Sequence, residues 1–173
     1  IMWRWMFNGT SGVINDILLR IGIIHSPIAW LASKDTALIS VIIANIWYGI
    51  PFFTIMITAA LRGVPQELYE AAEVDGANAV GKFFNITIPS IKSVILLTIL
   101  MRVIWIFNFP DLIYSMTQGG PGGSSHIITS FMMQKVQSLD YGLASALGLL
   151  VILFLTVFTI IYFSVTKFGR LEE

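Results

Sequence analysis

The sequence lacks cysteine and has few charged residues, and each shortage excludes a class of function. Without cysteine the chain can form no disulfide bond, thiolate nucleophile or cysteine-ligated metal site. Charged residues make up 12% of the chain and the formal net charge is zero, so the chain has no basic excess of the kind that binds nucleic acid. The two histidines, His25 and His126, lie far apart in expected loops, which argues against a metal site built from them.

Apolar residues are abundant instead. They make up 56% of the 173 residues, and the mean hydropathy is +0.82. A soluble domain of this length could not bury so much apolar surface, so we expect the chain to lie in lipid. Three apolar stretches are long enough, at a helical rise of ~1.5 Å per residue, to cross a ~30 Å hydrocarbon layer. They are residues 37–61, 90–116 and 142–166. Because helices satisfy their own backbone groups in lipid, we predict an all-α polytopic membrane protein.

The remaining segments complete this prediction. Residues 1–7 form an apolar aromatic run with no initiator methionine and no signal-peptide pattern, so we expect the end of a truncated transmembrane helix in the C-terminal portion of a longer protein. Basic residues favour a cytoplasmic position for segment 62–89 and for the tail 167–173. Loops 8–36 and 117–141 then face outward. The basic residues on the cytoplasmic side are Arg62, Lys82, Lys92, Lys167 and Arg170, against Arg20, Lys34 and Lys135 outside.

Both outward loops are predicted to be structured. Val13, Ile17, Leu18 and Ile21 have helical spacing, which predicts a short amphipathic helix at the membrane interface. The stretch "TQGGPGGSSH" is typical of a tight turn. It lacks the Gly-Lys-Ser/Thr ending of a phosphate-binding loop, and that function is rejected.

Segment 62–89 is predicted to hold two short helices. Pro65 suits the start of a helix, and Glu67 and Glu70 suit the positive end of its dipole. Gly76 is the expected stop. A second helix is expected over 77–84, ended by the residues before Pro89. On physical grounds alone, a docking surface and a solvated helical loop fit the segment equally well.

The same segment resembles the EAA signature of bacterial ABC-importer permeases. That signature is Glu-Ala-Ala, three residues, Gly, nine residues, Ile, one residue, an apolar residue and Pro, and it corresponds here to Glu70, Ala71, Ala72, Gly76, Ile86, Ile88 and Pro89. Ile88 stands where the family usually has leucine. Further stretches such as "NIWYGIPF", "FNFPDLIYSMTQGGPGG" and "YGLASAL" extend the resemblance to the carbohydrate-type subfamily, which includes the maltose and glycerol-3-phosphate permeases. Its members usually have six or more spans, so this chain would hold roughly the last three and a half.

The resemblance implies a mechanism and a set of partners. Segment 62–89 would be a coupling loop that docks on a cytoplasmic ATPase, through Glu70, Ala71, Ala72, Asp75, Gly76 and Pro89. The partners would be a second permease subunit, two ATPase subunits and an extracytoplasmic solute-binding protein, which Gly119, Gly120 and Pro121 would contact. ATP and Mg²⁺ would bind the ATPase, so this chain needs no cofactor and is not itself an enzyme. The location implied is the bacterial inner membrane.

Two spans carry candidate substrate residues. Asn45, Tyr48, Gly49 and Phe52 share one face of the first span, where an amide, a phenol, a gap and a ring suit a sugar. Helix–helix packing is the alternative, and the resemblance favours substrate. The second span has Trp105, Asn108 and Asp111 at intervals of three, with Pro110 expected to kink the helix. Asn108 is the strongest candidate, and an interfacial charge is the alternative for Asp111.

Arg102 lies near the middle of the second span, at a cost of about 2.5–3.5 kcal/mol on insertion scales. It could hold a phosphate or carboxylate, or cap a backbone carbonyl, and the resemblance favours the structural role. In the third span, small residues four apart predict close helix packing: Gly142 with Ala146, and Ala144 with Gly148.

The leading hypothesis is therefore a permease subunit of a binding-protein-dependent sugar importer. An ion-coupled secondary transporter is one rival, and the lack of acidic residues in mid-span counts against it. A permease for a non-sugar solute such as glycerol 3-phosphate is another. A membrane scaffold would leave the polar face of the first span unexplained.

Overall fold

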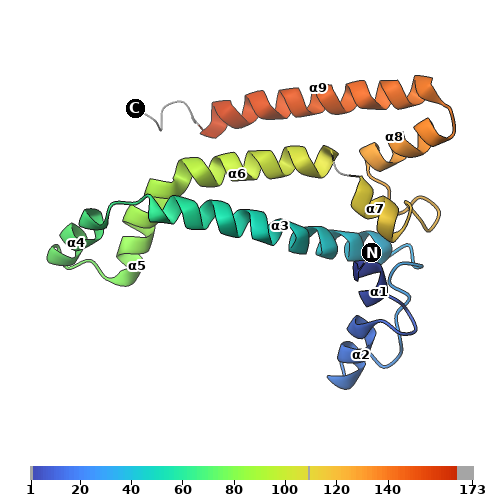
Figure 1. Cartoon of the computed structure of the whole chain (residues 1–173), viewed down its shortest axis with the longest axis horizontal. Helices are drawn as coiled ribbons and strands as arrows, with labels where there is room; N and C mark the ends of the chain where they lie inside the picture. Colours follow the sequence, from blue (N-terminus) through green and yellow to red (C-terminus); the bar gives the residue numbers. More distant parts are fainter. Residues whose placement is uncertain (1, 109, 167–173) are drawn as a thin grey trace. The chain divides into compact units, whose positions relative to one another are not determined.

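The computed structural model describes residues 2–108 and 110–166, and every regular element in these residues is helical. The elements are α1 (Met2–Met6), α2 (Val13–Arg20), α3 (Ala37–Arg62), α4 (Gln66–Val74), α5 (Ala79–Lys82), a π-helix η1 (Phe83–Thr87), α6 (Ile88–Asn108), α7 (Asp111–Met116), α8 (Ile128–Gln137) and α9 (Tyr141–Thr166) (Figure 1). The all-α prediction is confirmed. The expected cytoplasmic tail 167–173 lies outside the described residues.

Three of these helical segments are long and apolar enough to cross a membrane, as predicted. They are Ala37–Arg62, Ala79–Asn108 and Tyr141–Thr166. The first contains Pro51 in its interior. The third is the most apolar, and only 6% of its most hydrophobic window is buried within the chain. Most of its surface therefore faces the surroundings, as expected of a helix solvated by lipid or by another membrane protein.

The second predicted span has a different course from the one expected. A single helix over 90–116 was predicted, but α6 ends at Asn108 and α7 begins at Asp111. Pro110 precedes α7 with φ −71° and ψ −13°. Proline has no backbone N–H to continue the ladder of α6, yet its fixed φ suits the start of a new helix. Asp111 is thus on a different helix from Trp105 and Asn108.

The prediction that the helix ends before Pro89 is wrong. Ile88 has helical angles (φ −61°, ψ −47°), and the chain stays helical from α5 through η1 into α6. The residue before a proline usually avoids this conformation. Here the five residues Phe83–Thr87 form a π-helix, whose wider turn changes the hydrogen-bonding register just ahead of the proline. The missing N–H of Pro89 then falls in the first turn of α6.

The chain forms two compact units. Among the described residues, one comprises 2–48, 105–108 and 110–155, and the other 49–104 and 156–166. The core of the first unit is Phe7, Val41, Ala44, Ile113 and Met116. Trp3 packs against this core, stacking on Phe7 with ring centroids 5.7 Å apart and meeting Trp47 edge-on at 5.6 Å.

The predicted packing face of α9 has a partner in this first unit. Ala144 is buried, and a Cβ added at Gly148 would lie 3.4 Å from Sδ of Met132 in α8. In contrast, a Cβ added at Gly142 would have nothing within 4 Å. The lack of a side chain at Gly148 therefore leaves room for Met132 of α8 beside α9.

In the second unit, α9 is tied to α6 by a polar contact. Tyr162 donates a hydrogen bond of 2.7 Å from Oη to the carbonyl of Leu96. Thr98, on α6, is fully buried and satisfies its hydroxyl by donating to the carbonyl of Val94 at 2.6 Å. Both hydroxyls thus find backbone acceptors inside an apolar segment, where an unpaired polar group would be costly.

Candidate functional site

The first candidate site is the pair of short helices that follows α3. We call residues Gln66–Thr87, comprising α4, α5 and η1, the α4–α5 clip. Helix α4 ends where Gly76 was predicted to stop it, and Gly76 has φ +78°. The N–H of Ala77 bonds to the carbonyl of Ala72 at 2.8 Å, and the N–H of Gly76 to that of Glu73 at 3.0 Å. This pair of bonds is the Schellman motif, which needs a left-handed residue at Gly76.

Side chains close the corner after Gly76. Oδ1 of Asn78 caps α5 by accepting from the N–H of Gly81 at 2.8 Å. Nζ of Lys82 donates to Oε1 of Glu73 at 2.5 Å, joining α5 to α4. The hydrogen bond and the positive charge of Lys82 lower the pKa of Glu73 below its ordinary value. Glu73 is exposed, so this bond to Lys82 is screened by water.

A second contact joins α4 to the π-helix. Oη of Tyr69 lies 2.9 Å from Oγ1 of Thr87, and either hydroxyl can donate. Oγ1 of Thr87 also lies 3.4 Å from the carbonyl of Lys82, across one turn of η1. Sequence reasoning missed both Tyr69 and Thr87. The available signal was a threonine inside the apolar run "FFNITIP", where a hydroxyl needs a partner.

The rest of the clip presents an exposed surface. Glu70, Ala71, Asp75 and Gly76 are exposed and Ala72 is half-buried, and Pro89, which follows the clip in α6, is also exposed. Apolar side chains project beside them, with Val74 89% exposed and Val80 64% exposed. Small residues at the surface allow close approach, and the neighbouring apolar groups gain from being covered. Such a surface is suited to contact with another molecule.

The second candidate site lies in the second unit, where α3 passes α6. Gly49 is buried, and a Cβ added there would lie 3.0 Å from Cζ, Nε and Nη2 of Arg102. The guanidinium of Arg102 therefore lies against the backbone of Gly49. Gly49 was expected to leave a gap for substrate, and the arginine occupies that gap. Phe52, one turn further along α3, is half-buried and meets Phe53 edge-on.

The other predicted substrate residues belong to the first unit. Asn45 is half-buried and lines an apolar cavity of about 180 Å³. Its neighbours there are Leu38, Val41, Ile42, Ile46, Ile106, Leu112, Ile113 and Ile127. Tyr48 is 55% exposed and Trp105 is 41% exposed, while Asn108 and Asp111 lie at the surface. The structure thus places the amide of Asn45 beside the last turns of α6, and leaves Asn108 accessible where α6 ends.

The first unit also holds the predicted glycine turn. Gly119 (φ +81°) is buried, with its α-carbon against the ring of His126. Ser125 is fully buried beneath the turn, 2.7 Å from Oγ1 of Thr117, and it donates to the carbonyl of Gly120. Burial lowers the pKa of His126. The turn is therefore fixed from inside, and Pro121 is half-exposed on its outer side.

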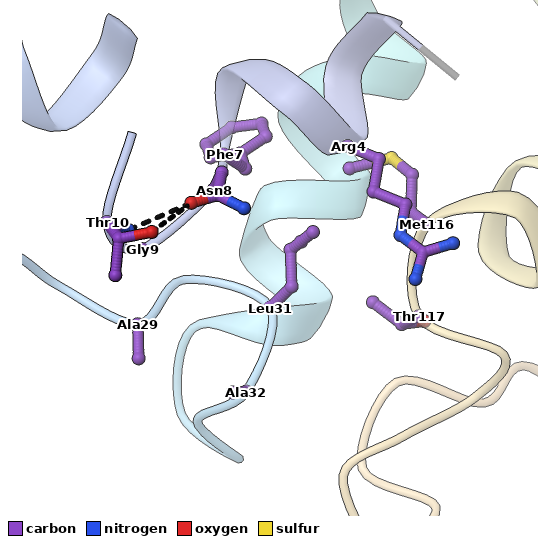
Figure 2. A pocket seen from close by; sticks show the side chains of 10 residues that line it. All are labelled: Arg4, Phe7, Asn8, Gly9, Thr10, Ala29, Leu31, Ala32, Met116 and Thr117. Carbon is purple, nitrogen blue, oxygen red and sulfur yellow. Dashed lines mark hydrogen bonds between the residues drawn. The ribbon is translucent and has the colours of Figure 1, made fainter. Parts of the chain in front are cut away.

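A pocket of about 440 Å³ opens beside this turn (Figure 2). Figure 2 shows the guanidinium of Arg4 next to Thr117, with Asn8 and Thr10 on the opposite side. Oδ1 of Asn8 accepts hydrogen bonds of 2.9 Å from both the N–H and the hydroxyl of Thr10. The polar lining is thus largely engaged in local turn contacts.

Asn15 is a buried residue that sequence reasoning also missed. It is 3% exposed and makes four hydrogen bonds. Nδ2 donates to the carbonyls of Gly9 and Ile28, and Oδ1 accepts from the N–H of Ile28 and from Nε1 of Trp30. The predicted apolar face of α2 is exposed on the other side, with Ile17 51% exposed, which suits an interfacial helix.

No group of three or more histidine, cysteine, aspartate or glutamate side chains within residues 2–108 and 110–166 could hold a metal ion.

Comparison with known proteins shows what the chain resembles. The family described as "Binding-protein-dependent transport system inner membrane component" matches residues 2–168. The trehalose/maltose transport system permease protein MalF of Thermococcus litoralis is 37% identical over 168 residues, covering 97% of this chain and 56% of that protein. The sulfoquinovosyl glycerol transport system permease protein SmoG of Agrobacterium fabrum is 34% identical, covering 96% of this chain and 54% of SmoG. The chain thus spans about half the length of these curated relatives.

A solved structure has the same fold. The crystal structure of a bacterial ABC transporter involved in the import of the acidic polysaccharide alginate includes a chain that superimposes with a TM-score of 0.80 at 24% sequence identity. The superposition covers 96% of this chain and 58% of that one.

Proposed function

This chain belongs to the family of binding-protein-dependent transport system inner membrane components, and on that premise we propose that its protein is a permease subunit of an importer that moves a sugar or oligosaccharide into the cell. Transport is driven by ATP hydrolysis on separate ATPase subunits, which bind the ATP and Mg²⁺. The observation that carries this proposal is the α4–α5 clip. It is a folded element between α3 and α6, and Glu70, Ala71 and Gly76 of the EAA signature are exposed on it.

The clip has the features that force transmission needs. Its corner is fixed by the Schellman bonds at Gly76 and its helices are cross-linked by side chains, so it transmits displacement. Glu70 is available to bond a partner, and Ala71 lets that partner approach the backbone. Closure of two ATPase subunits then moves the clip, and α3 and α6 move together with the clip. In this proposal the clip and the tail 167–173 face the cytoplasm.

Sugar is proposed to pass along the faces of α3 and α6 that carry polar and aromatic groups. Asn45 and Asn108 offer amides that both donate and accept hydrogen bonds, and Tyr48, Phe52 and Trp105 offer ring faces for the C–H surface of a sugar. Asp111 stands where α7 begins, near the outer entrance. On the outside, Gly119, Gly120 and Pro121 form the turn proposed to meet the solute-binding protein, and a second permease subunit completes the pathway.

A second candidate solute is an anionic one, such as a sugar acid or a polyol phosphate like glycerol 3-phosphate. The observation that favours it is Arg102, a permanent positive charge within a span beside Gly49. A guanidinium at this depth would attract a carboxylate or phosphate. Uptake of neutral and acidic sugars of matched size, compared in wild type and Arg102→Gln, separates the two. Loss confined to the acidic sugar supports the anionic candidate.

The proposal is tested by reconstituting the full-length subunit with its partner permease, ATPases and binding protein in liposomes. We expect sugar uptake that requires both ATP and the binding protein. Uptake driven by an ion gradient without ATP would instead establish a secondary transporter. For the site, Asn108→Ala is expected to reduce uptake at limiting sugar, and unchanged uptake would remove Asn108 from the pathway. Thr166→Val, at the end of α9, is the control because its hydroxyl donates to the carbonyl of Tyr162 in the same helix.

A further inference from the structure

We infer that Tyr69 and Thr87 are positioning residues that fasten α4 to the base of α6, so that the clip and this span move as one body. The inference rests on the proposed function, because it names the residues through which motion of a docked α4 reaches the membrane. Neither residue belongs to the EAA signature.

Two side-chain hydrogen bonds join α4 to residues 79–87 within the described part of the chain, and they differ in quality. The bond between Glu73 and Lys82 lies at the surface, where the carboxylate side chain is 64% exposed. Exposed ion pairs contribute little and are screened by salt. The bond between Tyr69 and Thr87 is 2.9 Å long and partly buried, and both residues are half-buried. Water competes less for a hydrogen bond that is shielded from solvent. The bond between Tyr69 and Thr87 is therefore a stronger restraint on α4 than the exposed bond between Glu73 and Lys82.

The place of Thr87 in the chain gives that restraint its effect. Thr87 is the last residue of η1, and Ile88 is the first residue of α6. A displacement of α4 therefore enters the spanning helix at its first turn. Threonine is branched at Cβ and stiff about χ1, so its hydroxyl follows the helix backbone closely. The hydroxyl of Tyr69 is carried on a rigid ring that is attached to α4.

The π-helix makes such a restraint necessary. A π-helical turn is wider than an α-helical turn and is a local irregularity in the helix. Without a brace, η1 would be the natural bending point between the clip and α6. Oγ1 of Thr87 approaches the carbonyl of Lys82 at 3.4 Å, so one hydroxyl spans the turn of η1 and also meets Tyr69. Loss of either hydroxyl would let α4 move without α6.

A distance measurement tests this directly. Spin labels are placed on exposed positions in α4 and α6, through Gln66→Cys and Lys92→Cys, in the full-length subunit assembled with its partners. Any cysteine elsewhere in the full-length protein is replaced by serine. Pulsed electron spin resonance then gives the distribution of label distances. We expect one narrow distribution in the parent protein. In Tyr69→Phe or Thr87→Val, the fraction of label distances outside that distribution should be about three- to tenfold larger than in the parent, which is the range expected for loss of one hydrogen bond.

Matched variants separate positioning from general damage. Thr87→Ser keeps the hydroxyl and should restore the narrow distribution. The double variant Tyr69→Phe/Thr87→Val should be no broader than Thr87→Val alone, because loss of the Thr87 hydroxyl already removes its bond to Tyr69. Tyr114→Phe and Thr166→Val lose hydroxyls that bond elsewhere and should resemble the parent. A parent-like distribution in both Tyr69→Phe and Thr87→Val would overturn the inference.

ATP hydrolysis supplies the second readout. The variants should retain the ATPase subunits on purification and keep their basal ATPase rate, while stimulation by binding protein and sugar falls about three- to tenfold. Full stimulation despite a broadened distance distribution would also overturn the inference. Absence of stimulation in the parent protein is a different result. It would contradict the proposed function, while the label distances would still decide whether Tyr69 and Thr87 fasten α4 to α6.

Discussion

The α4–α5 clip and the segment around Asn15 hold short elements together by opposite means. Around Asn15, one buried amide makes four hydrogen bonds that tie together Gly9, Ile28 and Trp30. In the clip, the cross-links are shared among a half-buried hydroxyl pair and an exposed ion pair, with Glu73 accessible to water. One segment has its polar groups satisfied inside, and the other keeps many of them at the surface.

This difference indicates which segment is stabilised by contacts within the chain and which needs contacts with another molecule. A buried, fully bonded amide fixes a loop without help, because every polar group it touches would be costly to leave unpaired. An exposed clip with small and apolar surface residues gains its remaining stability from whatever covers it. The Asn15 segment is therefore expected to act as a scaffold, and the clip as a contact element.

The largest effect is expected from breaking the scaffold. Asn15→Ala leaves the N–H of Ile28 and Nε1 of Trp30, both of half-buried residues, without their acceptor, and it should lower the free energy of unfolding by about 2–4 kcal/mol. Thermal denaturation of the full-length subunit in detergent measures this. Asp16→Ala, which removes only an exposed ion pair with Arg20, is the control and should shift stability by less than about 0.5 kcal/mol. Equal stability of both variants would refute the claim that the hydrogen bonds of Asn15 fix this segment.

A smaller effect is expected at the corner of the clip. Gly76 has φ +78°, so Gly76→Ala forces a side chain into the left-handed region at a cost of about 1–2 kcal/mol. Gly76→Asn should recover part of the loss, since asparagine tolerates this conformation. ATPase stimulation and stability, measured together, should rank wild type above Gly76→Asn above Gly76→Ala. If alanine performs as well as glycine, the Schellman corner does not matter for coupling.

Within the spans, Gly49 and Gly142 make a matched pair. A Cβ at position 49 would lie 3.0 Å from the guanidinium of Arg102, whereas one at position 142 would meet nothing within 4 Å. Gly142→Ala should be neutral or stabilising by up to about 1 kcal/mol, because alanine favours helix. Gly49→Ala should lose that gain to displacement of Arg102, leaving it about 1 kcal/mol less stable than Gly142→Ala. Identical thermal shifts for the two variants would argue against the close contact.

The smallest effect concerns the exposed ion pair. Lys82 lowers the pKa of Glu73, so the contribution of this pair is present at neutral pH and is lost as the pH falls through the lowered pKa. Lys82→Gln should raise the pKa of Glu73 toward its ordinary value, as followed by carbon NMR of labelled glutamate. Lys135→Gln changes a lysine that belongs to the first unit, and it should leave the titration of Glu73 where it was. A titration of Glu73 insensitive to Lys82→Gln would show that the pair does not form.

The sequence was sufficient for the features that rest on local pattern. Long apolar runs predicted the three spans, and Gly76 was correctly identified as a helix stop because a left-handed residue there is a local requirement. The prediction that the helix ends before Pro89 was wrong, because a π-helix changes the hydrogen-bonding register and no residue type predicts it. The division of residues 90–116 at Pro110 was foreseen only as a kink.

Contacts between residues that are far apart in the sequence could not be predicted from local sequence patterns. Asn15 lies thirteen residues from Ile28, and Tyr69 lies eighteen from Thr87. Their pairing depends on how the loops return, which spacing alone does not specify. The same holds for Arg102 and Gly49, each of which stood out in the sequence, although their contact did not. The roles of the predicted substrate residues stay predictions.

The most direct test of the account is ATP hydrolysis by the assembled transporter carrying Glu70→Ala, measured with and without binding protein and sugar. The account predicts that wild type is stimulated by both together, and that Glu70→Ala loses this stimulation and sugar uptake while its basal ATP hydrolysis persists. Stimulation and uptake in Glu70→Ala equal to wild type would contradict the claim that the α4–α5 clip couples this protein to an ATPase.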